Sequence, residues 1–111
     1  MILIIGGAWQ GKLSYAVKTY GLAESDLCDL ANGYQPDKRC YYHLESLSQQ
    51  ETTVTFPHNS IVIAREIGSG VVPIDASERI RREAHGVLLQ KLAAQADHVI
   101  RIFCGLPEVL K

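Results

Sequence analysis

The chain has 111 residues, a length that suits one domain over residues 1–111 and is too short for two. Its formal net charge of −1 gives no reason to expect a nucleic-acid partner. No apolar run reaches the roughly 18 residues that a membrane span needs. The cysteines Cys28, Cys40 and Cys104 lack the spacing of a metal site, so we expect reduced thiols in a cytoplasmic protein. We expect Cys28 and Cys104 to be buried on strands.

The first predicted elements are a buried strand and a helix. Residues 2–5 are continuously apolar, which is typical of a strand buried on both faces of a parallel sheet. A helix is predicted over residues 12–20, because its apolar residues share one face, and Gly21 can end it. That face consists of Leu13, Ala16, Val17 and Tyr20. A short strand is predicted within residues 25–30, and residues 31–38 have the composition of a loop.

The rest of the chain predicts two further helices and two further strands. We expect a short helix over residues 40–50 and a buried strand over residues 60–64. After a loop over residues 65–73, Asp75 caps the longest helix, which ends at Asp97 and precedes a last strand over residues 98–104. The buried stripe predicted for this helix is Ile80, Ala84, Val87, Leu88 and Leu92. Alternating strands and helices favour a small three-layer α/β domain, similar to P-loop NTPases, with a mainly parallel sheet.

A candidate phosphate-binding loop lies between the first strand and the first helix. It has the pattern G-x-x-x-x-G-K, in which backbone N–H groups and a lysine surround phosphate oxygens. The predicted nucleotide site is Gly6, Gly7, Ala8, Trp9, Gln10, Gly11, Lys12 and Leu13. The alternative without a binding role is a glycine turn followed by a surface lysine. The pattern predicts that ATP or GTP binds here, with Lys12 at the β- and γ-phosphates.

Leu13 stands where such a loop carries the serine or threonine whose hydroxyl binds Mg²⁺. Ser14 does not replace that hydroxyl, because one residue along a helix is about 100° of rotation. We therefore expect phosphate binding by the backbone and Lys12 to survive this change. We expect Mg²⁺ as a cofactor only if another group holds it.

A carboxylate at the end of a neighbouring strand is the second requirement of phosphoryl transfer. Glu66 follows the predicted strand over residues 60–64 and could hold Mg²⁺ or orient a nucleophile. The alternative is that Glu66 only pairs with Arg65 or caps the following loop. Asp29, at the end of the predicted second strand, is the rival candidate.

Three stretches together resemble the adenosylcobinamide kinase / adenosylcobinamide-phosphate guanylyltransferase family of cobalamin assembly. They are IIGGAWQGK, EIGSGVVP and REAHGVLLQKLAAQADHVIRIFCGLPEVLK. The family pattern reads GG-x-x-x-GKS, NEVG-x-GIVP, R-x-F-RD-x-x-G-x-x-NQ-x-LA-x-x-AD and AGLP-x-x-LK. The resemblance covers residues 1–20 and 60–111, about two thirds of the chain.

The resemblance implies a kinase that moves the γ-phosphoryl group of a nucleoside triphosphate to a hydroxyl of cobinamide. It implies that Lys12 and Glu66 are catalytic, with Glu66 at the metal or at the acceptor hydroxyl. It also implies a corrinoid partner and a homo-oligomer. Arg79 and Arg82 lie three residues apart on the long helix and could contact phosphate or substrate, or simply form a solvated face.

The middle of the chain departs from this family. Family members carry an H-x-x-x-RP stretch whose histidine accepts GMP, and residues 33–57 contain no such stretch. His43 is the one histidine there, and it is either the counterpart of the guanylylated histidine or a solvent-facing residue. We expect guanylyl transfer to be lost. Two further readings stay open: a nucleotide- or anion-binding module without turnover, and a partner subunit in an oligomer.

Overall fold

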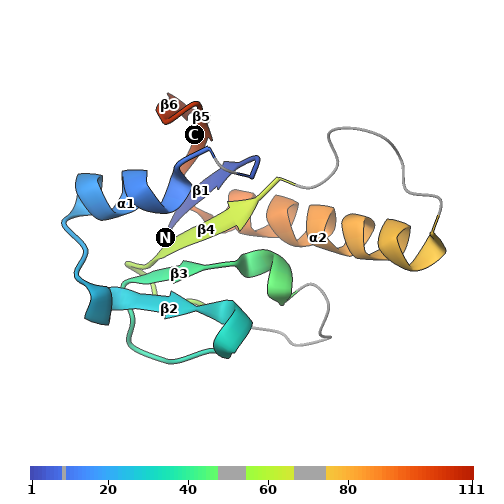
Figure 1. Ribbon diagram of the computed structural model, residues 1–111, viewed down its shortest axis with the longest axis horizontal. Coiled ribbons are helices and arrows are strands. Elements are labelled where there is room, and N and C mark those ends of the chain that lie inside the picture. Colours follow the sequence, from blue (N-terminus) through green and yellow to red (C-terminus); the bar gives the residue numbers. More distant parts are fainter. Residues whose placement is uncertain (9, 48–54, 67–74) are drawn as a thin grey trace.

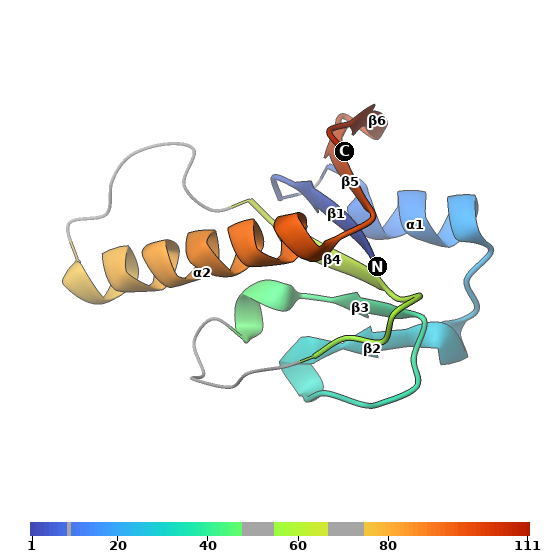
Figure 2. The same ribbon diagram turned by 180° about the vertical axis from the view of Figure 1, so that it is seen from behind.

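The computed structural model describes residues 1–8, 10–47, 55–66 and 75–111. They form a six-stranded sheet with one long helix on each face (Figures 1 and 2). The strands are β1 (Ile2–Gly6), β2 (Leu27–Asp29), β3 (Cys40–Tyr42), β4 (Ile61–Arg65), β5 (His98–Phe103) and β6 (Leu106–Val109). The helices are α1 (Lys12–Tyr20) and α2 (Ala76–Gln95), with 3₁₀ turns η1 (Glu24–Asp26), η2 (Leu30–Asn32) and η3 (Leu44–Ser46).

The sheet has the order β2-β3-β4-β1-β5-β6, and only β6 runs antiparallel to its neighbour. Along β1 to β5, successive apolar residues alternate between two clusters, one on each face of the sheet. Leu3, Val62 and Val99 pack with Leu92 and Ala96 at the α2 face, whereas Ile4, Ile63 and Ile100 pack with Ala16 of α1. This arrangement confirms the prediction of a small three-layer α/β domain with a mainly parallel sheet.

The two long helices begin where the sequence predicts, and α2 ends at Gln95, two residues before the predicted Asp97. Helix α1 spans residues 12–20, its predicted apolar face lies in the core beside Ala16, and Gly21 caps its end. At the start of α2, the Asp75 carboxylate accepts a hydrogen bond from the Ser77 N–H at 2.8 Å. Neither helix is long and apolar enough to cross a membrane, and the same holds for every helix of the described residues.

Residues 40–50 are not a helix, so this prediction was wrong. Residues 40–42 form the inner strand β3, which pairs in parallel with β2 and β4, and only the short turn η3 follows. Cys40 and Tyr41 are fully buried. Pairing with a neighbouring strand on both edges therefore makes this segment a strand. Its three residues are too few to show the alternation of apolar and polar side chains that predicts a strand.

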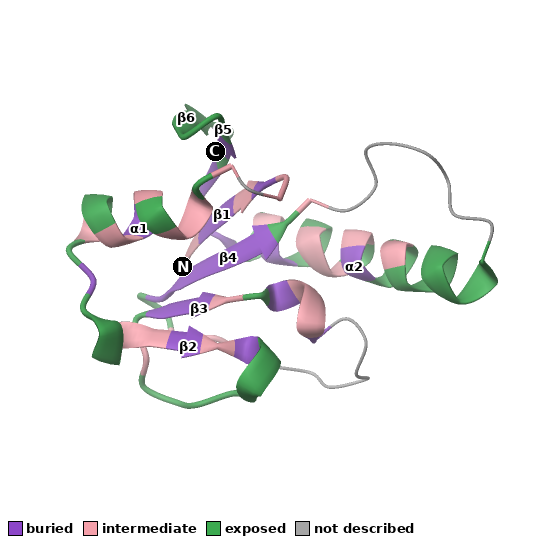
Figure 3. Ribbon diagram, viewed as in Figure 1, coloured by how far each residue is buried: buried purple, intermediate pink, exposed green. Residues whose placement is uncertain are grey.

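The buried stripe predicted for α2 is also wrong in part. Leu92 is buried, but the Ile80 and Val87 side chains are 66% and 63% exposed. Figure 3 shows that the first half of α2 extends beyond the sheet and is mostly exposed. The fully buried residue on this helix is instead His85, which is 0% exposed.

Cys28 is buried on β2 as predicted, but Cys104 is exposed and lies just after β5. Cys104 has a left-handed backbone, with φ of 52°, in the turn that connects β5 to β6. Strand β6 was not predicted, because Pro107 in its middle disfavours a strand away from a sheet edge. All three cysteines are free thiols.

Candidate functional site

Polar residues that follow or end four neighbouring strands meet at one edge of the sheet. The candidate phosphate loop follows β1, Asp29 ends β2, His43 follows β3, and Arg65 ends β4. Because these four strands are parallel, their carboxyl ends lie side by side. In open α/β sheets this edge is where ligands bind, near the point at which the connections change sides. Here α1 and α2 leave the neighbouring strands β1 and β4 for opposite faces.

The loop before α1 has the geometry of an anion site. Gly11 adopts a left-handed backbone with φ of 86°, and α1 begins directly after it without a side-chain cap. The first N–H groups of α1 are therefore not satisfied by a capping side chain, and the positive end of the helix dipole faces the same way. The Lys12 ammonium folds back over the loop and donates to the Gly7 carbonyl at 2.6 Å.

The loop is also fixed from its other side, by the turn between β5 and β6. The Cys104 N–H donates to the side-chain oxygen of Gln10, and the Gly105 N–H donates to the Gln10 carbonyl at 2.9 Å. Gly6 lies so close to β5 that a Cβ atom there would be 2.6 Å from the Ile102 carbonyl oxygen. Trp9, predicted to belong to the nucleotide site, lies outside the described residues.

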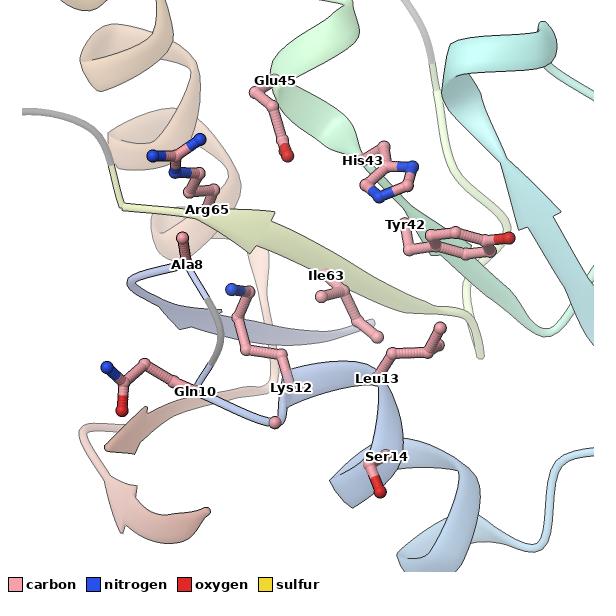
Figure 4. A pocket seen from close by; sticks show the side chains of 11 residues that line it. Ala8, Gln10, Lys12, Leu13, Ser14, Tyr42, His43, Glu45, Ile63 and Arg65 are labelled. Atoms are coloured by element: carbon pink, nitrogen blue, oxygen red, sulfur yellow. The ribbon is translucent and has the colours of Figure 1, made fainter. Parts of the chain in front are cut away.

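A pocket of about 360 Å³ opens in front of Lys12 (Figure 4). It is lined by Ala8, Gln10, Gly11, Lys12, Leu13, Ser14, Tyr42, His43, Glu45, Ile63 and Arg65. Five of the predicted nucleotide-site residues, from Ala8 to Leu13, therefore line one cavity together with His43. Arg65 and Glu45 lie on the side of the pocket toward which the Lys12 ammonium points (Figure 4). Leu13 and Ile63 form an apolar wall.

The charged side chains around the pocket change the pKa of Lys12. Its pKa is lowered, first because partial burial disfavours the charged form and also because the Arg65 charge repels it. The carboxylates of Glu45 and Glu66 act in the opposite direction and raise the pKa of Lys12. A bound anion in this pocket would act in the same direction as these carboxylates.

Glu66 does not line the pocket, although it lies at the predicted place after β4. Its N–H donates to the Gly6 carbonyl at 2.8 Å, and its carboxylate pairs with Arg101 at 3.3 Å. The alternative of an ion pair with Arg65 is therefore replaced by a pair with Arg101. Among the described residues, the carboxylate that lines the pocket is Glu45, for which the sequence carried no site signal.

The loop and Glu66 offer few free side-chain oxygens to the magnesium ion expected from the sequence. Leu13 has no oxygen to offer, and the Glu66 carboxylate is engaged by Arg101. Magnesium prefers several oxygen ligands in octahedral geometry. Among the described residues there is no group of three or more His, Cys, Asp or Glu side chains that could hold a metal ion.

His43 lies on the same pocket and has a partner that orients it. Its Nδ1 is 2.8 Å from Oδ1 of Asp29, the residue that ends β2. Burial alone would raise the pKa of Asp29, but the His43 and Ala31 hydrogen bonds outweigh it and lower that pKa. In the neutral imidazole, an Nδ1–H bonded to this carboxylate leaves Nε2 as the ring nitrogen without a proton. Asp29 thus acts on His43 rather than as the acid beside Lys12.

Arg79 and Arg82 are not among the residues that line this pocket. One ion pair on that part of α2 joins Arg81 to Glu78 at 2.9 Å. The pocket instead receives Arg65, Glu45 and Tyr42, which sequence reasoning missed as site residues. Arg65 had a usable signal, because it ends a buried parallel strand. Glu45 had none while residues 40–50 were read as a helix.

These features define a small α/β domain of the P-loop-like kind, with its candidate site at the carboxyl ends of the strands. Residues 30–110 match the family model of cobinamide kinase / cobinamide phosphate guanyltransferase, so the chain belongs to that family. The matched range includes three residues of the pocket, His43, Glu45 and Arg65. It begins after the candidate phosphate loop. No curated protein matches the chain.

Proposed function

We propose that the chain binds ATP or GTP at the Lys12 pocket and acts as a cobinamide kinase in cobalamin biosynthesis. The observation that carries this proposal is the common pocket of the phosphate loop, Arg65 and Glu45 at the carboxyl edge of the sheet. Membership of the cobinamide kinase family supports the acceptor class. The sequence predicted Glu66 as the catalytic carboxylate that acts with Lys12. The lining of the pocket favours Glu45 for this role instead.

The proposed reaction is transfer of one phosphoryl group to a hydroxyl. The hydroxyl oxygen of cobinamide bonds to the γ-phosphorus, and the bond from that phosphorus to the β–γ bridging oxygen breaks. The nucleoside diphosphate leaves, and the hydroxyl proton passes to a carboxylate, for which Glu45 is the pocket-lining candidate. Lys12 would exchange its bond to the Gly7 carbonyl for phosphate oxygens and stabilise the transferring charge.

The first test is calorimetric titration of ATP and GTP, with and without Mg²⁺, into wild type and Lys12→Ala. We expect wild type to bind and Lys12→Ala to lose about tenfold or more in affinity, because a hydrogen bond to a charged group contributes about 1.5–3 kcal/mol. Thr19→Ala, an exposed change on α1, is the control. Absence of binding by wild type would contradict the proposal.

Turnover is tested separately, by transfer of labelled γ-phosphate to cobinamide. We expect labelled cobinamide phosphate from wild type, and loss of product with Glu45→Gln while nucleotide affinity is kept. Nucleotide binding without any product would instead support the alternative that the chain is a binding module without turnover. Leu13 and the Arg101 pair of Glu66 are the features that favour this alternative.

A second candidate activity is guanylyl transfer through His43, which the shortened middle of the chain led us to expect to be lost. The Asp29–His43 hydrogen bond on the pocket favours it, because it leaves Nε2 as a nucleophile. Nε2 would bond to the α-phosphorus of GTP, and the bond to the pyrophosphate oxygen would break. Incubation with GTP should then add one GMP to the protein, detected by mass spectrometry as an acid-labile adduct. His43→Gln should remove the adduct, and an unmodified wild type would contradict this activity.

A further inference from the structure

Arg65 has two properties to which the proposed phosphoryl transfer assigns no role. Its backbone is firmly placed, and its side chain lines the phosphate pocket. As the last residue of β4 it stands opposite Gly6, the last residue of β1, in the parallel register. Its carbonyl accepts a hydrogen bond at 2.6 Å from Nε2 of His85, which is fully buried on α2. The start of the side chain is therefore held between the phosphate loop and α2.

The guanidinium itself is available to a ligand. Arg65 is exposed, and within residues 1–8, 10–47, 55–66 and 75–111 its side chain makes no hydrogen bond or ion pair. Arg101, the neighbouring cation on β5, is already paired with Glu66 at 3.3 Å. The fork of a guanidinium matches two phosphate oxygens at once, which a lysine ammonium does not.

The opposite wall of the pocket explains why a second cation matters here. Leu13 supplies no hydroxyl to a metal, so the negative charge of a triphosphate must be balanced by other groups. Lys12 supplies one positive charge, and the Glu45 carboxylate on the same pocket offsets it. The charge that Arg65 adds makes the described pocket lining net positive.

We propose that Arg65 is a second phosphate-binding residue, and that with Lys12 it binds a nucleoside triphosphate without a metal ion held by the loop. This inference rests on the proposed nucleotide binding at Lys12. It adds Arg65 as a second phosphate-binding residue and adds that binding does not require a metal ion. The ligand class is a polyphosphate, carried by a nucleoside or free. Titration with ATP and with inorganic tripolyphosphate distinguishes these two sources.

The experiment is calorimetric titration of both ligands in EDTA and in excess Mg²⁺. Wild type is compared with Arg65→Gln, with Arg65→Lys, and with Arg81→Gln as a matched loss of one exposed arginine on α2. We expect wild type to bind in EDTA within about threefold of its affinity in Mg²⁺. Arg65→Gln should lose about tenfold or more, Arg65→Lys should lose less, and Arg81→Gln should not change. Equal melting temperatures of the variants show that folding is kept.

Other outcomes separate this inference from the proposal on which it rests. If wild type binds neither ligand, the nucleotide proposal itself fails. If Lys12→Ala loses affinity but Arg65→Gln binds like wild type, the nucleotide proposal stands and the role of Arg65 is overturned. Wild-type binding that requires Mg²⁺ also overturns it. Tighter binding of ATP than of tripolyphosphate assigns the ligand as a nucleotide, and equal binding assigns it as the polyphosphate group alone.

Discussion

The buried imidazole of His85 donates to the carbonyl oxygen of Arg65, and so joins the middle of α2 to the end of β4. A backbone carbonyl only accepts, so Nε2 carries a proton in this bond. The bond fixes the strand end from which Arg65 and Glu66 reach in different directions. His85 is therefore a positioning residue for the pocket, at a distance from it.

Replacing His85 by Phe should lower both stability and ligand affinity. The Arg65 carbonyl would lose its partner, at a cost of about 1–3 kcal/mol in the free energy of unfolding. His85→Gln, which keeps an N–H donor, should restore part of this loss. Urea denaturation measures the stability, and ATP titration measures the affinity. A destabilised His85→Phe that binds ATP like wild type would show a structural role alone.

Gly6 and Gly7 should respond very differently to alanine. A Cβ at Gly6 would lie 2.6 Å from the Ile102 carbonyl oxygen, whereas one at Gly7 would first meet the flexible side chain of Gln10 at 3.7 Å. We expect Gly6→Ala to cost about 1–3 kcal/mol of unfolding free energy, because β1 and β5 must separate locally. Gly7→Ala is the matched control and should stay close to wild type. Equal urea midpoints for the two variants would contradict the close approach of these strands.

Stability should fall as the pH rises above about 9, because burial raises the pKa of the Cys40 thiol from 9.0 to about 12. A raised folded-state pKa means that the folded protein holds the proton longer than the unfolded chain. The stabilisation is therefore complete below pH 9.0 and is lost as the pH approaches 12. Burial likewise raises the pKa of Tyr41 from 10.0 to about 12, so its effect adds to that of Cys40.

Urea denaturation at pH 8, 9, 10 and 11 measures this slope. Cys40→Ala should flatten it, by at most about 4 kcal/mol over the full range, since each pKa unit corresponds to about 1.4 kcal/mol. Cys104→Ala, which changes an exposed thiol, should keep the wild-type slope. The slopes are compared rather than the absolute values, because Cys40→Ala also leaves a small cavity. A Cys40→Ala slope equal to that of wild type would assign the alkaline loss to other groups.

The sequence predicted those parts of the fold in which local pattern and tertiary packing agree. Residues 2–5, 60–64 and 98–104 are largely apolar runs that become the inner strands β1, β4 and β5, respectively. The face of α1 and the Asp75 cap were also predicted, because both depend on neighbours within one or two turns. Strand β3 was missed because its pairing partners, β2 and β4, lie far away along the chain.

The candidate site was predictable only where one segment carries the whole signal. The phosphate loop is continuous in sequence, so its lining of the pocket could be predicted. The roles of Glu45 and Glu66 depend on whether a carboxylate turns toward Lys12 or toward Arg101. That choice depends on side-chain packing between strands, which a single sequence does not encode in its local pattern. The same holds for the partner of His43, which is 14 residues away.

The β6 edge should mediate self-association, as the family resemblance leads us to expect. The Leu106 and Val109 side chains on this edge strand are 70% and 72% exposed, and Phe103 and Leu110 beside it are also exposed. An apolar edge strand offers both unpaired backbone groups and surface to a second copy. Val109→Lys should therefore shift light-scattering mass toward the monomer. Val87→Lys, at an equally exposed position on α2, is the control, and a monomeric wild type would contradict the expectation.

Leu13→Ser should make nucleotide binding respond to Mg²⁺. It returns a hydroxyl to the first turn of α1, beside the phosphates that Lys12 is proposed to bind. We expect ATP affinity of this variant to rise about tenfold or more on adding Mg²⁺, while wild type changes little. Leu13→Ala removes the same apolar contacts with the core without adding an oxygen, so it controls for the loss of packing. If Leu13→Ser and Leu13→Ala respond to Mg²⁺ alike, the leucine is not what separates this pocket from a metal-dependent one.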